Sequence, residues 1–223
     1  MMKNTVKRIQ TAVGTTTDGI FGNITLAAVA AKLGVEANLR EVQRRVGAVV
    51  DGMFGSETAR KVLAAVGGGW PSQAEVRSGK SIFGKAGDES NLVSITPPYQ
   101  LYYEGNPVRT IRVHKLIANS VLDALDEVLL YYGEKRIHEL GLDDYSGAYN
   151  YRATVSGKSV SMHAWGIAID FAAEHNQYEM KKPVASLSRH ECQKWWEIWE
   201  AHGAVSLGRA RNYDWMHIQF ATL

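Results

Sequence analysis

Two segments in the C-terminal half of the chain carry residue types typical of a metal-dependent catalytic site. The first contains His163 and Asp170, and the second contains Asp214 and His217. Two histidines and one carboxylate are a ligand set that zinc uses in catalytic sites, where a fourth position stays open for water. A further carboxylate can act as the acid and base that manages the protons of that water. These four residues therefore predict a zinc site with its own proton-transfer group.

The hydrophobic pattern predicts that strands present two of these residues. Residues 166–171 and 215–220 alternate between apolar and other side chains, as half-buried strands do. Asp170 lies inside the first predicted strand, beside a small alanine that leaves room over the carboxylate. His217 lies inside the second.

The other two residues need bends in the chain. The spacing from His163 to Asp170 fits neither one helix face nor one strand face, so we expect Gly166 to provide a turn. Asp214 and His217 would point in opposite directions along a regular strand. We therefore expect Asp214 in the bend before that strand, where it can lean over the metal.

Two helices are predicted around these strands. An amphipathic helix is predicted over 110–132, with Gly133 as its terminator. A capping-box pattern at 188–191 opens a second helix that runs to about His202. Its large apolar residues have helical spacing and are expected in the core, namely Cys192, Trp195, Trp196 and Trp199. Helices packed on an antiparallel sheet predict an α+β domain.

The N-terminal part repeats itself at a spacing of roughly 33 residues. The segment Asp18–Thr25 reads DGIFGNIT, and Asp51–Thr58 reads DGMFGSET. Each repeat is expected to form a helix, a turn with glycine at positive φ, and a second helix. We predict a small all-α helical-repeat domain over 1–67, a glycine-rich linker over 68–80 and the α+β domain over 81–223.

Composition limits the possible partners and compartments. The 223 residues carry a net charge of +2, too little to indicate a nucleic-acid partner, and one cysteine excludes an internal disulfide. No apolar run approaches the roughly 18 residues that a membrane span needs. The start lacks an apolar secretory segment, so we expect the protein to stay in the cytoplasm where it is made. We also expect it to be a monomer.

The first 67 residues are more basic than the rest. They carry nine lysines and arginines against five acidic residues, a net charge of about +4. Such a domain would be drawn weakly to an anionic polymer. Solvated helix faces are the alternative explanation of the same charges.

The two D-G-x-F-G-x-x-T turns resemble the peptidoglycan-binding domain found on many cell-wall hydrolases. The resemblance covers about residues 5–67 and occurs in two copies in register. It implies that this domain holds peptidoglycan. A generic helical repeat used for protein contacts is the alternative.

The pattern S-x-H-x-x-G-x-A-x-D at 161–170, followed by D-x-M-H at 214–217, resembles the VanY-like zinc peptidases. That family includes D-Ala-D-Ala carboxypeptidases and the L-alanyl-D-glutamate endopeptidases of bacteriophage endolysins. The sequence around Tyr149–Arg152 is most similar to the endolysin branch. One departure is Ser206–Arg211, where related sequences often have a W-G-G-x-W run. Substrate contacts on that side of the cleft are therefore left open.

The resemblance implies a role for each motif residue. His163, Asp170 and His217 would bind zinc, and Asp214 would be the catalytic carboxylate. Arg152 would stabilise the developing oxyanion, and Ser161 matches a motif serine near the metal that is expected to contact substrate. Alternatives remain for two of these roles: Asp214 could instead orient a ligand histidine, and Arg152 could form a surface salt bridge.

Together these features predict a modular endolysin that hydrolyses the L-Ala-D-Glu bond of peptidoglycan stem peptides. It would accumulate in the host cytoplasm and reach the wall, in the periplasm, at lysis. A D,D-carboxypeptidase or endopeptidase is one alternative. A wall-binding protein without activity is the other.

Overall fold

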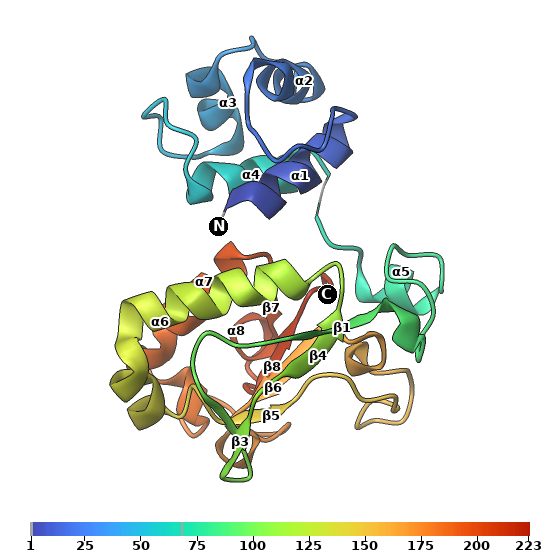
Figure 1. Ribbon diagram of the computed structural model, residues 1–223, viewed down its shortest axis with the longest axis vertical. Coiled ribbons are helices and arrows are strands. Elements are labelled where there is room, and N and C mark those ends of the chain that lie inside the picture. The colour runs from blue at the N-terminus through green and yellow to red at the C-terminus, as the bar shows by residue number, and fades with distance from the viewer. Residues whose placement is uncertain (1, 68) are drawn as a thin grey trace. The chain divides into compact units, whose positions relative to one another are not determined.

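The computed structural model describes residues 2–67 and 69–223, which divide into two compact units, Met1–Gly69 and Trp70–Leu223 (Figure 1). The mixed α+β prediction is confirmed, since the chain contains helices and small antiparallel sheets. No helix among the described residues is long and apolar enough to cross a membrane.

The first unit contains four helices whose apolar faces share one core. The helices are α1 (Met2–Val13), α2 (Asn23–Leu33), α3 (Leu39–Val46) and α4 (Ser56–Ala65). Ile9 and Val42 occupy equivalent positions in the two repeats, and both are fully buried. Phe21 of the first turn stacks on Phe54 of the second, with ring centroids 3.5 Å apart. The two repeats therefore meet through equivalent residues.

A buried glutamine fixes the turn of each repeat. Gln10 Nε2 donates to Asp18 Oδ1 at 2.7 Å and to Thr25 Oγ1 at 3.1 Å, and Gln10 Oε1 accepts from the Gly19 amide at 2.9 Å. Gly19 has φ of +80°, the left-handed conformation predicted for the turn. The aspartate, glycine and threonine of the repeated motif are thus held by one side chain.

The second repeat forms the same hydrogen bonds. Gln43 Nε2 donates to Asp51 Oδ1 at 2.7 Å and to Thr58 Oγ1 at 3.2 Å, and the Gly52 amide donates to Gln43 Oε1 at 2.9 Å. In both repeats, hydrogen bonding from the glutamine and from the backbone lowers the pKa of the turn aspartate. The aspartate, glycine and threonine of the repeated motif therefore stabilise the turn in both repeats.

The second unit is built around a four-stranded antiparallel sheet in the order β5-β6-β8-β7. Its strands are β5 (Tyr145–Gly147), β6 (Ala168–Phe171), β7 (Val205–Ser206) and β8 (His217–Gln219). Two smaller antiparallel pairs precede it: β1 (Leu92–Ile95) with β4 (Ile111–His114), and β2 (Leu101–Tyr103) with β3 (Asn106–Val108). The helices of this unit are α5 (Gln73–Arg77), α6 (Ala118–Leu140), α7 (Gln193–Ala201) and α8 (Leu207–Arg211).

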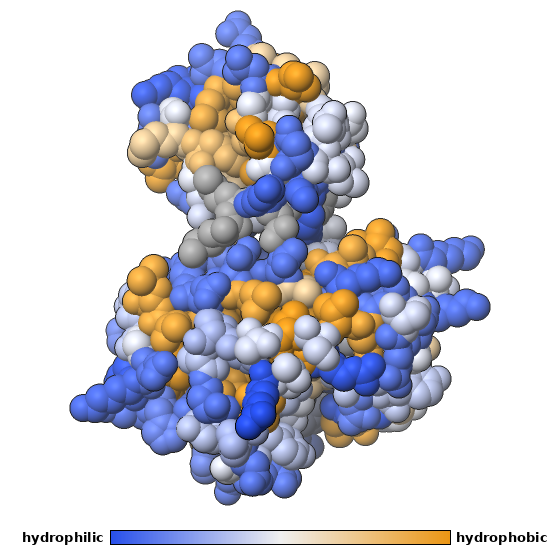
Figure 2. All heavy atoms as spheres, viewed as in Figure 1, coloured by the Kyte–Doolittle hydropathy of each residue, from blue (hydrophilic) through white to orange (hydrophobic). Residues whose placement is uncertain are grey.

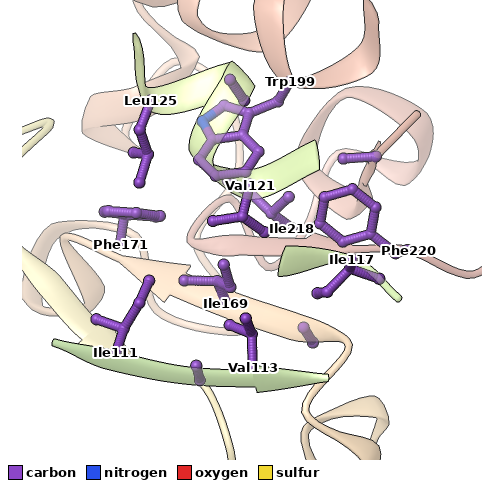
Figure 3. Packing of buried hydrophobic residues seen from close by; sticks show 14 of the residues in the cluster. Ile111, Val113, Ile117, Val121, Leu125, Ile169, Phe171, Trp199, Ile218 and Phe220 are labelled. Carbon is purple, nitrogen blue, oxygen red and sulfur yellow. The ribbon is translucent and has the colours of Figure 1, made fainter. Parts of the chain in front are cut away.

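One apolar core joins the sheet to the helices and to β4. In Figure 3 the side chains of β4 and β6 point toward those of α6 and α7. Ile169 and Phe171 of β6 are fully buried in this core, as the alternation of the sequence predicts, and the Phe171 ring meets Trp195 edge to face at 5.0 Å. The predicted core tryptophans of α7 are all buried there: Trp195, Trp196 and Trp199.

Three boundaries differ from the sequence prediction. Residues 111–114 form β4 rather than helix, and α6 begins only at Ala118, because this segment pairs with β1. Gly133 (φ +70°, ψ +155°) interrupts the helix as predicted, but a second helical segment follows it directly and extends α6 to Leu140. The predicted capping box at 188–191 does not form; the Ser188 hydroxyl donates to the Ala185 carbonyl instead, and α7 begins at Gln193.

Residues 70–80 are not a linker. Trp70 is buried in the core of the second unit, and Phe83 and Phe220 lie against its ring. The Gln73 amide donates to the Thr222 carbonyl at 2.8 Å, and the Thr222 amide donates to the Pro71 carbonyl at 3.0 Å. The second unit therefore begins at Trp70, ahead of the predicted boundary at residue 81.

We expect Gln43→Leu to destabilise the first unit by about 1–3 kcal/mol, because buried partners of the glutamine lose their hydrogen bonds. Calorimetry of the full chain would measure the melting temperature of this unit. Gln193→Leu, at an exposed hydrogen bond in α7, is the matched control. An unchanged melting temperature for Gln43→Leu would show that the glutamine does not hold the turn.

Candidate metal centre

Two neighbouring strands bring Asp170 and His217 together. Asp170 of β6 is the direct partner of His217 of β8 in the antiparallel register. Paired residues on adjacent strands point to the same face of a sheet, and His217 Nδ1 lies 3.0 Å from Asp170 Oδ1. The sequence placed both residues in strands but could not give this register.

His163 completes the group from a short 3-10 helix, Met162–Trp165, immediately before β6. Its Nε2 lies 3.1 Å from Asp170 Oδ2 and 3.2 Å from His217 Nδ1. The potential ligand atoms of the three residues all lie within 4.8 Å of one another. The structure thus brings together the three residues that the sequence proposed as metal ligands.

Gly166 makes the turn between His163 and the strand. It has φ of +66° and ends the 3-10 helix, where the Gly166 amide donates to the His163 carbonyl at 2.9 Å. A Cβ atom at this position would lie 2.5 Å from the Leu92 side chain and 3.1 Å from the His114 amide nitrogen. Both the backbone angle and the close approach of neighbouring atoms therefore require glycine here.

Two local contacts orient His163. The Ser161 hydroxyl accepts from the His163 amide at 3.4 Å and caps the 3-10 helix. The His163 Nδ1 lies 2.5 Å from the carbonyl oxygen of Ala148. Since a carbonyl only accepts, Nδ1 must carry the proton, and the Nε2 lone pair faces Asp170. This is the arrangement that a metal-binding histidine needs.

The electrostatics of the group favour a bound cation. All three side chains are buried. Burial alone would raise the pKa of Asp170, but the charges and hydrogen bonds of His163 and His217 outweigh it and hold that pKa well below its ordinary range. Burial opposes charge on His217, yet hydrogen bonding and attraction from Asp170 raise the pKa of its ring. A buried carboxylate with converging imidazole nitrogens could hold a divalent metal ion.

Asp214 lies in the turn just before β8, outside the ligand group. It adopts a left-handed backbone conformation with φ of +53°, and its carbonyl accepts from the His217 amide at 3.1 Å. The residue is only 8% exposed, and Oδ1 has no hydrogen-bond partner among the described residues. Burial raises the pKa of Asp214 to about 6, although interactions with His217, His163 and Arg152 act in the opposite direction.

A cleft of about 260 Å³ opens over these groups. Its lining includes the three potential ligands and Asp214, together with Ser161 and Arg152. Arg152 is exposed, and its Nη1 donates to the Ala153 carbonyl at 3.3 Å. Arg152, His163 and Asp170 also line a second hollow of about 410 Å³.

Within the segment Ser206–Arg211, which the sequence left open, Leu207–Arg211 form α8 and support the site. Ser206 caps this helix, with its hydroxyl accepting from the Arg209 amide at 3.2 Å. A Cβ atom at Gly208 would lie 2.4–2.7 Å from the Trp215 ring, so glycine lets this ring pack on the helix. Leu207 and Tyr213 line the cleft. This packing holds Trp215 in place, the residue that follows Asp214.

Sequence reasoning missed two further contributors. Ala148 acts through its backbone carbonyl, which no residue pattern marks. Gln219, whose Oε1 lies 3.2 Å from His217 Nε2, is fully buried. Its polar side chain two residues after a ligand histidine, in an otherwise apolar strand, is a signal that could have found it.

No family model, curated protein or solved structure matches this chain.

We expect the metal-stripped chain to bind one divalent ion per molecule, as isothermal titration calorimetry would measure. Asp170→Asn removes the only charged group of the ligand set and should weaken binding by more than the roughly 10–100-fold that loss of a group supporting a ligand costs. Asp126→Asn, at an exposed position of α6, is the control. Equal metal affinities for Asp170→Asn and Asp126→Asn would contradict the assignment of Asp170 as a metal ligand.

Proposed function

We propose that this protein is a zinc-dependent peptidase that cleaves peptidoglycan stem peptides between L-Ala and D-Glu. The observation that carries the proposal is the pairing of a buried His163-Asp170-His217 group with a separate carboxylate residue, Asp214, that lines the same cleft. A three-residue ligand set that leaves a position open is typical of catalytic rather than structural zinc. The resemblance to the VanY-like zinc peptidases supports the choice of reaction and substrate.

The donor set fits zinc, because imidazole nitrogen and carboxylate oxygen are both ligands that zinc accepts. When bound, zinc polarises a carbonyl group and makes water more acidic. Asp214 would accept a proton from the water that attacks the scissile carbonyl carbon. It would return that proton to the leaving amine nitrogen as the C–N bond breaks. The carboxylate is thereby regenerated, and no serine or cysteine nucleophile is needed.

Arg152 and Ser161 take different parts in this proposal. The Arg152 guanidinium, on the wall of the cleft, would stabilise the negative charge that develops on the carbonyl oxygen. Ser161 lines the cleft too, but its hydroxyl caps the helix that carries His163. We therefore assign Ser161 to the support of a ligand as well as to substrate contact.

The first unit supplies the second part of the proposal, a helical-repeat domain that holds peptidoglycan. Figure 2 shows hydrophobic side chains on its surface among hydrophilic ones. Ile20 and Met53 occupy the same position in the two turns, and their exposed fractions are 67% and 66%. Because Gln10 and Gln43 fix both turns, these two apolar side chains are held at equivalent, solvent-facing positions. Such a duplicated surface suits a repetitive polymer, and host lysis by a bacteriophage would be its biological setting.

We expect Asp214→Asn to lower the rate of peptidoglycan cleavage by about 10²–10⁴-fold, because the general acid and base is lost. Labelling of newly released amino termini, followed by mass spectrometry of the fragments, measures both the rate and the bond. Asp126→Asn is again the control. Zinc content should be retained in both variants.

Other products would redirect the proposal. Release of free D-Ala without new L-Ala or D-Glu ends would indicate a D,D-carboxypeptidase. Unchanged lysis by Asp214→Asn would show that this carboxylate is not catalytic. Wall binding without any cleavage by the zinc-loaded chain would favour a binding protein.

For the first unit, we expect the double variant Ile20→Ser and Met53→Ser to bind insoluble peptidoglycan more weakly than the parent chain. The loss follows from the apolar area that each side chain would bury on the polymer. Sedimentation with purified cell walls, in the Asp214→Asn background to prevent cleavage, measures binding. Leu130→Ser, at an exposed apolar position of the second unit, is the control. Equal binding by both variants would exclude these turns from the ligand surface.

A further inference from the structure

A chain of side-chain hydrogen bonds extends from His217 away from the ligand group. His217 Nε2 meets Gln219 Oε1 at 3.2 Å, and Gln73 Nε2 donates to the same Gln219 oxygen at 2.9 Å. Arg77 Nη1 in turn donates to Gln73 Oε1 at 3.1 Å. Gln73 and Arg77 belong to α5, the helix that the sequence had assigned to a linker. These contacts join the start of the second unit to a potential metal ligand.

The two ends of this chain fix the direction of every hydrogen bond in it. Arg77 has donors only, so the group of Gln73 that faces it must be the carbonyl oxygen. The amide nitrogen of Gln73 then faces Gln219 and requires an acceptor there. At the other end, Gln219 Nε2 donates to the Ala221 carbonyl at 2.7 Å, which can only accept. Gln219 is therefore held with its oxygen toward His217.

An oxygen at that position decides which nitrogen of His217 carries the proton. Gln219 Oε1 can only accept, so the neutral His217 ring donates from Nε2 and keeps a lone pair on Nδ1. Nδ1 is the atom that lies 3.0 Å from Asp170 Oδ1 and 3.2 Å from His163 Nε2. Without the glutamine, Asp170 would favour a proton on Nδ1, because a carboxylate is the stronger acceptor.

We infer that Gln219, oriented by Gln73 and Arg77, is a positioning residue that keeps the Nδ1 lone pair of His217 directed toward the metal site. Backbone contacts hold the arrangement in place, since the backbone N–H of Gln73 also donates to the Thr222 carbonyl. Arg77 is anchored separately by donation from Nε to the Val160 carbonyl at 3.0 Å. The inference rests on the metal-binding part of the proposed function and not on the peptide bond that is cleaved.

The first test compares Gln219→Met with the parent chain. Methionine keeps a similar length but offers no strong acceptor, so the His217 proton should move toward Nδ1 in the metal-free protein. Nitrogen-15 NMR of the histidine rings, at alkaline pH where the ring is neutral, distinguishes the two tautomers. Zinc affinity, measured by competition with a chelator, should fall by about 10–100-fold. Gln193→Met, on the exposed face of α7, should change neither quantity.

Gln73→Met provides a second variant that is safer for folding, because Gln73 is only partly buried and Gln219 stays intact. It should shift the tautomer in the same direction and weaken zinc binding by less than Gln219→Met does. If both variants kept the parent tautomer and zinc affinity, the inference would be overturned, even if their melting temperatures fell. If the parent chain bound zinc with this tautomer but cleaved no peptidoglycan, the proposed peptidase function would fail and the positioning role would stand.

Discussion

The pairing of Asp170 with His217 across two antiparallel strands is the constraint on which the rest of the site depends. Strand register is discrete, so a slip of one residue would turn either side chain to the opposite face of the sheet. The register is set by the buried neighbours in the same strands, Ile169 and Ile218, which are also direct partners. The core that stabilises the fold therefore also fixes the position of the polar group on the other face.

This arrangement places a strongly polar group where water is scarce. Burial of an unpaired carboxylate and two imidazoles is costly, and the cost falls only if each polar atom has a partner or a cation binds among them. Ala148 and Gln219 satisfy the outward nitrogens of the two rings, while the inward atoms face one another. The outer side of the group is thus satisfied by the protein, and its inner side could hold a cation. That asymmetry distinguishes the group from an ordinary buried ion pair.

The sequence predicted much of this site, because the motif spacing carries local information. Gly166 as a turn, Asp170 and His217 in strands and Asp214 in the preceding bend all follow from short-range pattern and backbone stereochemistry. The structure places each of them accordingly, although β8 starts only at His217, where a longer strand was predicted. Short-range patterns could not predict which strands pair with one another across long sequence distances. Residues 111–114 have an apolar spacing that suits a helix, but pairing with β1 makes them a strand.

The same limit explains the linker error. Three glycines followed by Trp70-Pro71 end a helix, and the sequence could not show that Trp70 enters a core that also contains residues as distant as Phe220 and Ala221. Ala148 was missed for a related reason. Its role depends on which backbone carbonyl lies opposite a histidine ring, and neighbours in sequence do not determine that.

The attachment of residues 71–73 to Thr222 has a mechanical consequence. If the first unit were held and the second were pulled away from it, the tension would pass along the chain through Gly69 to Trp70. The first bonds to carry that load in the second unit are those of Pro71 and Gln73 with Thr222. The Gln73 side chain donates directly to Gln219, which contacts His217. Traction on the tether would therefore reach the ligand group through side-chain hydrogen bonds, as well as the apolar core through Trp70.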